Sequence, residues 1–141
     1  MSAATVWKAL KVKYKAIQGI KDIVLGEPTT VHATPLIYAA YDSFDRPLQS
    51  EPPARNLTGT THQFAMRLLL DLTDPQTAEE QLLEFVDRIP DAIAADAHLD
   101  QTIASGHASV RSGVTGYITI AKTLFRMMEF TCTVLEKRVP S

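Results

Sequence analysis

A strict alternation of inward and outward positions runs through the middle of the chain, from His62 to Leu72. Its even positions form a mostly apolar row: His62, Phe64, Met66, Leu68, Leu70 and Leu72. Odd positions include Gln63, Arg67 and Asp71. Successive side chains of a strand point to opposite faces, so this pattern predicts a half-buried strand whose even face is buried.

A second extended segment comes earlier in the chain, over residues 31–41, VHATPLIYAAY. It is rich in the β-branched and aromatic residues that favour strands. Proline cannot donate a hydrogen bond to a neighbouring strand, so Pro35 predicts that the strand begins after it or lies at a sheet edge.

Spacings of three and four residues predict a helix near the N-terminus. Thr5 is the candidate N-cap, Gly19 weakens the end, and LGEP at 25–28 stops the helix. Its apolar stripe is formed by Val6, Leu10, Tyr14 and Ile17.

A second amphipathic helix follows residue 73. Either Asp74 caps it with Pro75 in the first turn, or Thr77 and Glu80 form a capping box. Its apolar stripe comprises Ala78, Leu82, Phe85, Val86, Ile89 and Ile93. Pro90 is expected to kink or end the helix near Ile89. We expect the stripe to pack on the even face of the 62–72 strand.

The last third of the chain predicts more strands. Residues 107–112 and 117–121 are short strand candidates, with Gly113 and Gly116 flanking a turn between them. From residue 123 onward both faces carry apolar side chains, which is typical of a central or interface strand. The predicted class is therefore α+β, a mainly antiparallel sheet flanked by an N-terminal and a central helix. One domain over residues 1–141 accommodates these elements.

Residues 42–59 are the most irregular part of the chain. This segment contains three of the eight prolines, has little apolar content and shows no periodicity. Unstructured connections of this length inside compact domains are usually functional or disordered. The sequence therefore predicts a long loop between two well-fixed strands.

Charge and composition exclude few classes of protein. Charged residues make up 21% of the chain and the net charge is -2, which gives no overall attraction to nucleic acid. Five of the seven lysines nevertheless fall within the first 21 residues, where they serve as a solvated helix face or as phosphate contacts. No apolar run approaches a membrane span, and the N-terminus lacks the pattern of a secretory signal.

The candidate chemical groups do not form a recognisable catalytic set. His62 has no accompanying nucleophile motif, and the Gly-rich phosphate loops are missing. Asp96, His98 and Asp100 alternate and would converge on a metal only in an extended segment. The lone Cys132 excludes an intrachain disulfide and is expected to be a small core residue. No catalytic, cofactor-binding or metal-binding residue is predicted, and we expect a protein that is not an enzyme.

The segments taken together resemble the tail-terminator family of long-tailed bacteriophages, whose members are also called tail-completion or minor tail proteins. The resemblance spans roughly residues 6–138. It rests on ALKVKYKAIQGIKDIVLGEP, TPLIYAAYDSFDRP, THQFAMRLLLDLTDPQTAEE, IPDAIAAD and GYITIAKTLFRMMEFTCTVLEKR. The family has no catalytic signature to transfer.

This resemblance implies a virion protein, assembled in the host cytoplasm, that forms a six-membered ring at the head-proximal end of the tail tube. Such a ring stops tube polymerisation, joins the head or neck protein, and lets DNA pass without sequence-specific binding. The expected partners are further copies of the chain, the tail-tube protein and the connector. No cofactor or membrane is implied. Candidate contacts with neighbouring subunits or the tube are Asp42, Asp45, Arg46, Glu51 and Arg55.

We also expect residues 42–59 to be mobile in an isolated subunit and ordered in the ring, because a partner must offset the entropy lost on ordering. Three other functions remain open at this stage. They are another neck component such as a head-completion or adaptor protein, a small ligand-binding module or enzyme, and a nucleic-acid-binding domain.

Overall fold

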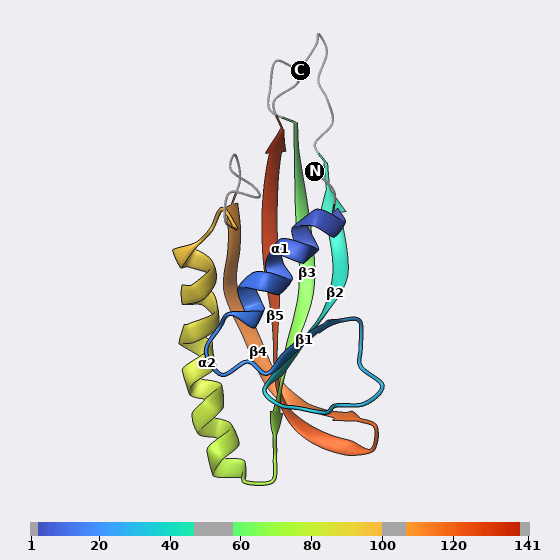
Figure 1. Ribbon diagram of the computed structural model, residues 1–141, viewed down its shortest axis with the longest axis vertical. Coiled ribbons are helices and arrows are strands. Elements are labelled where there is room, and N and C mark those ends of the chain that lie inside the picture. Colours follow the sequence, from blue (N-terminus) through green and yellow to red (C-terminus); the bar gives the residue numbers. More distant parts are fainter. Residues whose placement is uncertain (1–2, 47–57, 100–106, 139–141) are drawn as a thin grey trace.

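The computed structural model describes residues 3–46, 58–99 and 107–138 as two helices and a five-stranded sheet (Figure 1). The helices are α1 (Ala3–Lys15) and α2 (Pro75–Ala95). The strands, in their order across the sheet, are β1 (Asp22–Leu25), β2 (Leu36–Asp45), β3 (Thr58–Asp71), β5 (Thr123–Arg138) and β4 (His107–Ile120). Only β1 and β2 are parallel, so the predicted α+β class is confirmed.

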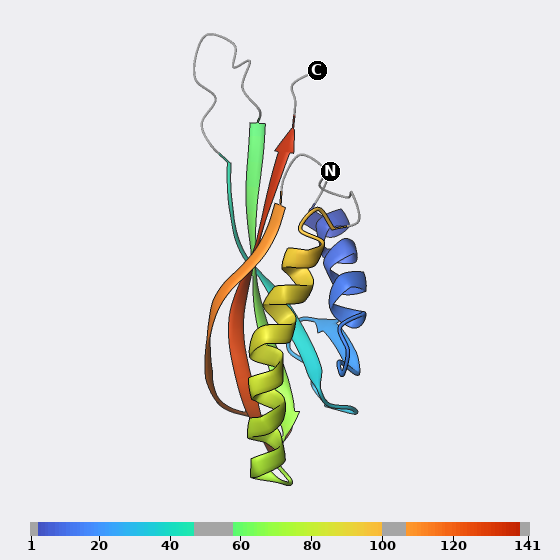
Figure 2. The ribbon, with the colours of Figure 1, turned by 90° about the vertical axis from the view of Figure 1, so that its left-hand side faces the viewer.

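Both helices cover the same face of the sheet (Figure 2). The main core lies between them and the strands, and the even residues of β3 from Phe64 to Leu70 are almost completely buried there. The α2 stripe enters the same core through Leu82, Phe85 and Ile89. The expected packing of this helix is therefore confirmed, except that Val86 remains 44% exposed.

Asp74 caps α2, as the first of the two predicted alternatives requires. Its carboxylate accepts hydrogen bonds from the backbone N–H of Gln76 at 3.1 Å and from Thr77 Oγ1 at 2.7 Å. Pro75 occupies the first turn, where its missing N–H has no consequence. The hydrogen bonds lower the pKa of the Asp74 carboxyl, that from Thr77 most strongly.

The ends of both helices differ from the prediction. α1 begins before Thr5, which is therefore no N-cap, and it ends at Lys15. Gly19, at a φ of +97°, then turns the chain into β1, a strand that the sequence did not predict. α2 continues past Pro90 to Ala95, because Ile93, the next residue of its apolar stripe, is also buried in the core.

The two short strands expected near the C-terminus form one continuous strand, β4. Gly113 and Gly116 both lie inside it, and Gly113 is the first paired residue after a register shift that begins at Val110. A Cβ at Gly113 would lie 2.8 Å from the carbonyl oxygen of Glu129, so the glycine serves a close approach to β5 and not a turn. The actual turn is formed at residues 121–122, both at positive φ.

β5 is a central strand, as its two apolar faces predicted, and it pairs with β3 and β4. One face joins the main core. The other face contributes Phe125 to a second apolar cluster on the opposite side of the sheet, which also contains Leu36, Tyr38, Leu69 and Ile120. Val24, Val31, Ile118 and Met127 pack against this second cluster.

The Tyr14 hydroxyl and the Cys132 thiol face each other inside the main core. Both side chains are fully buried, which confirms the expected core position of Cys132. No described group offers the hydroxyl a well-aligned hydrogen bond, and a thiol is a weak partner. Burial raises the pKa of Cys132 from its ordinary 9.0 to about 11, although the contact with Tyr14 acts in the opposite direction.

We predict that truncating the α2 stripe destabilises the fold. Phe85→Ala should lower the free energy of unfolding by about 2–5 kcal/mol, because it leaves a cavity among core residues. Leu83→Ala is the matched control, since Leu83 is on the same helix and is 67% exposed. Chemical denaturation of both variants measures the difference. Equal losses would contradict the placement of the stripe.

We also predict an alkaline loss of stability that depends on Cys132. Between about pH 9 and about pH 11 the unfolded chain releases the thiol proton while the folded chain keeps it, so the free energy of unfolding falls with rising pH. Urea titrations at both ends of this window should show a smaller fall for Cys132→Ala than for the unchanged protein. The pKa of Tyr14 is also raised and acts in the same direction in both proteins. An identical fall in the two proteins would contradict the prediction.

Candidate functional site

The predicted site residues that the structure describes lie at one end of the sheet. Asp42, Asp45 and Arg46 are all exposed there. Asp45 is the last residue of β2, and Arg46 follows it. Glu51 and Arg55 lie outside the described residues, as does most of the segment whose ordering was predicted.

The expected loop of residues 42–59 is shorter than predicted, because the β2–β3 ladder continues into it. Phe44 pairs with His62, and Asp45 pairs with Thr61. β3 in turn already begins at Thr58. The alternation was hidden from sequence reasoning because Asp42 is an extra residue at a register shift, and such a bulge resets the period of two.

The bulge places Tyr41 and Phe44 on the same, helix-covered side of the sheet. Tyr41 pairs with Phe64 before the bulge and Phe44 pairs with His62 after it, and both partners are buried in that side. Trp7 of α1 stacks on Phe64 with ring centroids 6.1 Å apart. We call these five residues the aromatic cluster.

The aromatic cluster is buried at its base and open to solvent at its rim. Phe64 is 1% exposed, whereas Tyr41 is 40% and Phe44 is 64% exposed. Tyr41 meets Phe64 edge to face, with centroids 5.1 Å apart and planes at 86°, which is a favourable arrangement for aromatic rings. The partly exposed Tyr41 ring is therefore held against a buried aromatic residue.

His62 belongs to this base. It is 5% exposed, and its Nδ1 lies 2.6 Å from Tyr41 Oη, within hydrogen-bonding distance. Desolvation raises the pKa of the Tyr41 hydroxyl, while the positive charge of Arg46 lowers it. The buried imidazole thus lies on the helix-covered face of the sheet, where it contacts the Tyr41 hydroxyl.

The metal arrangement considered for Asp96, His98 and Asp100 requires an extended segment, and residues 96–99 form a turn instead. Asp96 ends α2 and forms an ion pair with Lys13 at 3.5 Å, while Asp100 lies outside the described residues. Within residues 3–46, 58–99 and 107–138, no three metal-binding side chains gather at one point. Neither α1 nor α2 has the length and apolarity that a membrane-spanning helix requires.

The lysines of α1 lie next to a helix of opposite charge. Lys8, Lys11 and Lys15 are exposed on α1. The exposed acidic residues of α2 are Glu79, Glu80, Glu84, Asp87 and Asp91. Because the two helices share one face of the sheet, their charges oppose each other, and that face carries no uniform basic field for nucleic acid.

Comparison with protein-family models finds no matching family, and a search of curated proteins finds no significantly similar sequence.

The exposed aromatic residues of the aromatic cluster were missed when site residues were predicted from charge. Tyr41 and Phe44 were not among the predicted site residues, although they flank Asp42 and precede two residues that were. The available signal was a pair of aromatic residues at the start of a polar segment. The bulge between them was not readable from the sequence.

We predict that Tyr41→Phe lowers the free energy of unfolding by about 0.5–1.5 kcal/mol, because one hydrogen bond to the buried His62 is lost. Phe44→Ser is the control, since that ring is mostly exposed and makes no such bond. Thermal and urea denaturation distinguish the two variants. Equal stability of Tyr41→Phe and the unchanged protein would show that the bond does not hold this end of the sheet.

Proposed function

We propose that this protein is a structural subunit of a phage tail, resembling tail terminators, which forms a ring on the head-proximal end of the tail tube. In this role it stops tube polymerisation and presents a surface for joining to the head or neck. The proposal makes it a non-enzymatic virion protein whose partners are its own copies, the tail-tube protein and the connector. DNA passes through the ring without sequence-specific contacts.

The observation that carries the proposal is the exposed rim of the aromatic cluster with its adjacent charges. Aromatic and arginine side chains are enriched in protein–protein interfaces, whereas lysine and acidic residues are depleted in their centres. Here Tyr41 and Phe44 offer apolar area, and Asp42, Asp45 and Arg46 surround them with charges of both signs. Charges of both signs fix the register of a partner more than they add affinity.

The architecture also suits a mechanical role. Every residue of β3 pairs with β5, which gives a long central ladder that includes His62 and Phe64 of the aromatic cluster. β4 forms a long sheet edge that pairs with β5 on one side and with no other described strand. Unpaired edges attract further chains unless they are protected. A contact between two different surfaces of identical subunits forms a closed ring when the rotation between neighbouring subunits divides a full turn evenly.

We predict that the rim is needed for tail assembly but not for folding. Phe44→Asp should leave the melting temperature within a few degrees of the unchanged protein, because the ring is mostly exposed. It should nevertheless give overlong tubes, or tails without heads, when tube protein is assembled in its presence. Electron microscopy of tube lengths measures this outcome.

Val12→Asp is the matched control, because Val12 is 71% exposed and lies on α1 away from the rim. It should support normal tube lengths. Normal tubes with Phe44→Asp would remove the rim from the mechanism. If the unchanged protein has no effect on tube length, the proposed function itself is wrong.

A further inference from the structure

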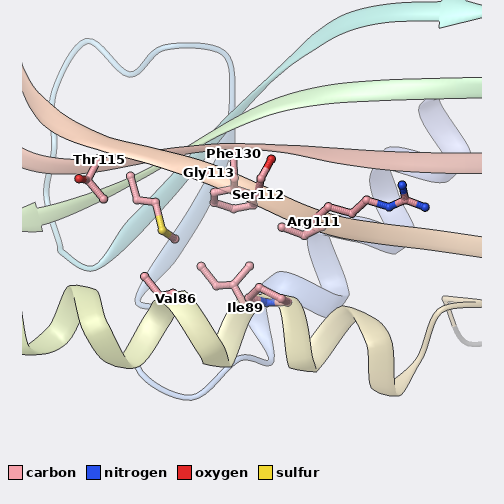
Figure 3. Close-up of a pocket in the computed structure, with 10 residues that line it drawn as sticks. Val86, Ile89, Arg111, Ser112, Gly113, Thr115 and Phe130 are labelled. Carbon is pink, nitrogen blue, oxygen red and sulfur yellow. The ribbon is translucent and has the colours of Figure 1, made fainter.

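An apolar cavity of about 140 Å³ opens between α2 and β4 (Figure 3). Val86 and Ile89 project into it from the helix, and Met128 and Phe130 of β5 also line it. Its volume is close to the roughly 150 Å³ of an engineered apolar cavity that holds a benzene molecule. The cavity therefore has room for one apolar side chain of moderate size.

The cavity lies at the edge of the sheet because of the local structure of β4. Gly113 lacks a side chain where a Cβ would meet the carbonyl oxygen of Glu129 in β5, and the register shift before it bends the strand. Val86, on the other wall, is 44% exposed although it belongs to the apolar stripe of α2. Arg111, at the rim, is exposed and extends away from the cavity (Figure 3).

The opposite edge of the sheet carries an exposed apolar side chain. Leu25, the last residue of β1, is 58% exposed. Ile23 of the same strand is buried in the main core, so Leu25, two residues later, points to the same helix-covered side of the sheet. The cavity lies on that side too, because α2 forms one of its walls.

The charges beside these two features are complementary. Glu27 is exposed two residues after Leu25, and Arg111 is exposed beside the cavity. Glu27 also acts on Arg67 of its own chain, but only as the weakest of the influences that raise the pKa of Arg67. No described residue forms an ion pair with Glu27 or Arg111.

We propose that a second copy of this chain inserts its Leu25 into the cavity, with its Glu27 facing Arg111. β1 runs antiparallel to β4, since β1 and β2 are parallel and the three remaining pairings are antiparallel. A rotation about an axis along the strands therefore brings the β1 edge of one copy to the β4 edge of the next in antiparallel orientation. Two different surfaces meet, so the contact propagates around a ring. This inference rests on the proposed ring and names its subunit contact.

Sedimentation velocity and native mass spectrometry of the full chain test the apolar half of the contact. Leu25→Asp should weaken self-association on the order of tenfold or more, because a charge replaces the side chain that fills the cavity. Val12→Asp, at a residue of α1 that is 71% exposed, should assemble as the unchanged protein does. Circular dichroism checks that both variants are folded. Unchanged assembly of folded Leu25→Asp would overturn the proposal.

A charge exchange tests the polar half and the direction of the contact. Arg111→Glu and Glu27→Arg should each weaken assembly, while the two changes in one chain should restore it. An equimolar mixture of the two single variants should also assemble, because each supplies the charge that the other needs. Lys122→Glu, at the hairpin turn, controls for net charge. Failure of both the double variant and the mixture to recover would overturn the pairing.

The tube-length assay separates this contact from the proposed function. If assembly follows Leu25 and the charge exchange but tubes are not capped, the contact stands and the tail role is wrong. If tubes are capped normally by every variant, this contact is overturned and the tail role stands. A protein that stays monomeric both alone and with tube protein would overturn both.

Discussion

The antiparallel pairing of β3 with β5 is the interaction on which the rest of the molecule depends. It runs from the Thr58–Arg138 pair to the Asp71–Phe125 pair, and the other strands are added outward from it. Its helix-covered face supplies Phe64, Met66 and Phe130 to the main core, while its other face supplies Phe125 to the second cluster. A ladder that is fixed by burial on both faces cannot slip by one residue without exchanging those faces.

The parts of the fold that were predictable are those whose pattern is long and local. β3, β5 and the α2 stripe each repeat a period over many residues, and the Asp74 cap lies immediately before the helix it starts. β1 was missed because four residues carry too little periodicity, and its pairing with β2 is fixed by burial of Ile23 in a core built from distant segments. β4 was divided in two because Gly113 was interpreted as a turn residue, whereas residues 121–122 turn the chain without glycine.

The candidate site was predictable in position but not in composition. Charge and irregularity drew attention to residues 42–59, and three of the selected side chains do lie exposed at the end of the sheet. The exposed rings beside them were missed, because their common orientation depends on the bulge at Asp42. The cavity was also unpredictable, since Val86 reads as an ordinary core position and becomes exposed only where β4 bends away.

The bulge at Asp42 lets β2 remain paired with β3 while Tyr41 and Phe44 lie on the same face of the sheet. In a regular strand, residues three apart point to opposite faces of the sheet. Tyr41 would then lie on the helix-covered face and Phe44 on the other face. The extra residue lets the hydrogen-bonded backbone continue to Asp45 while Tyr41 and Phe44 share a side. Pairing Asp42 within the ladder, in place of the bulge, would shift each later residue by one position and move Phe44 across the sheet without changing any aromatic residue. The side of the sheet on which the exposed Phe44 ring lies is therefore set by the pairing register of β2 as well as by its sequence.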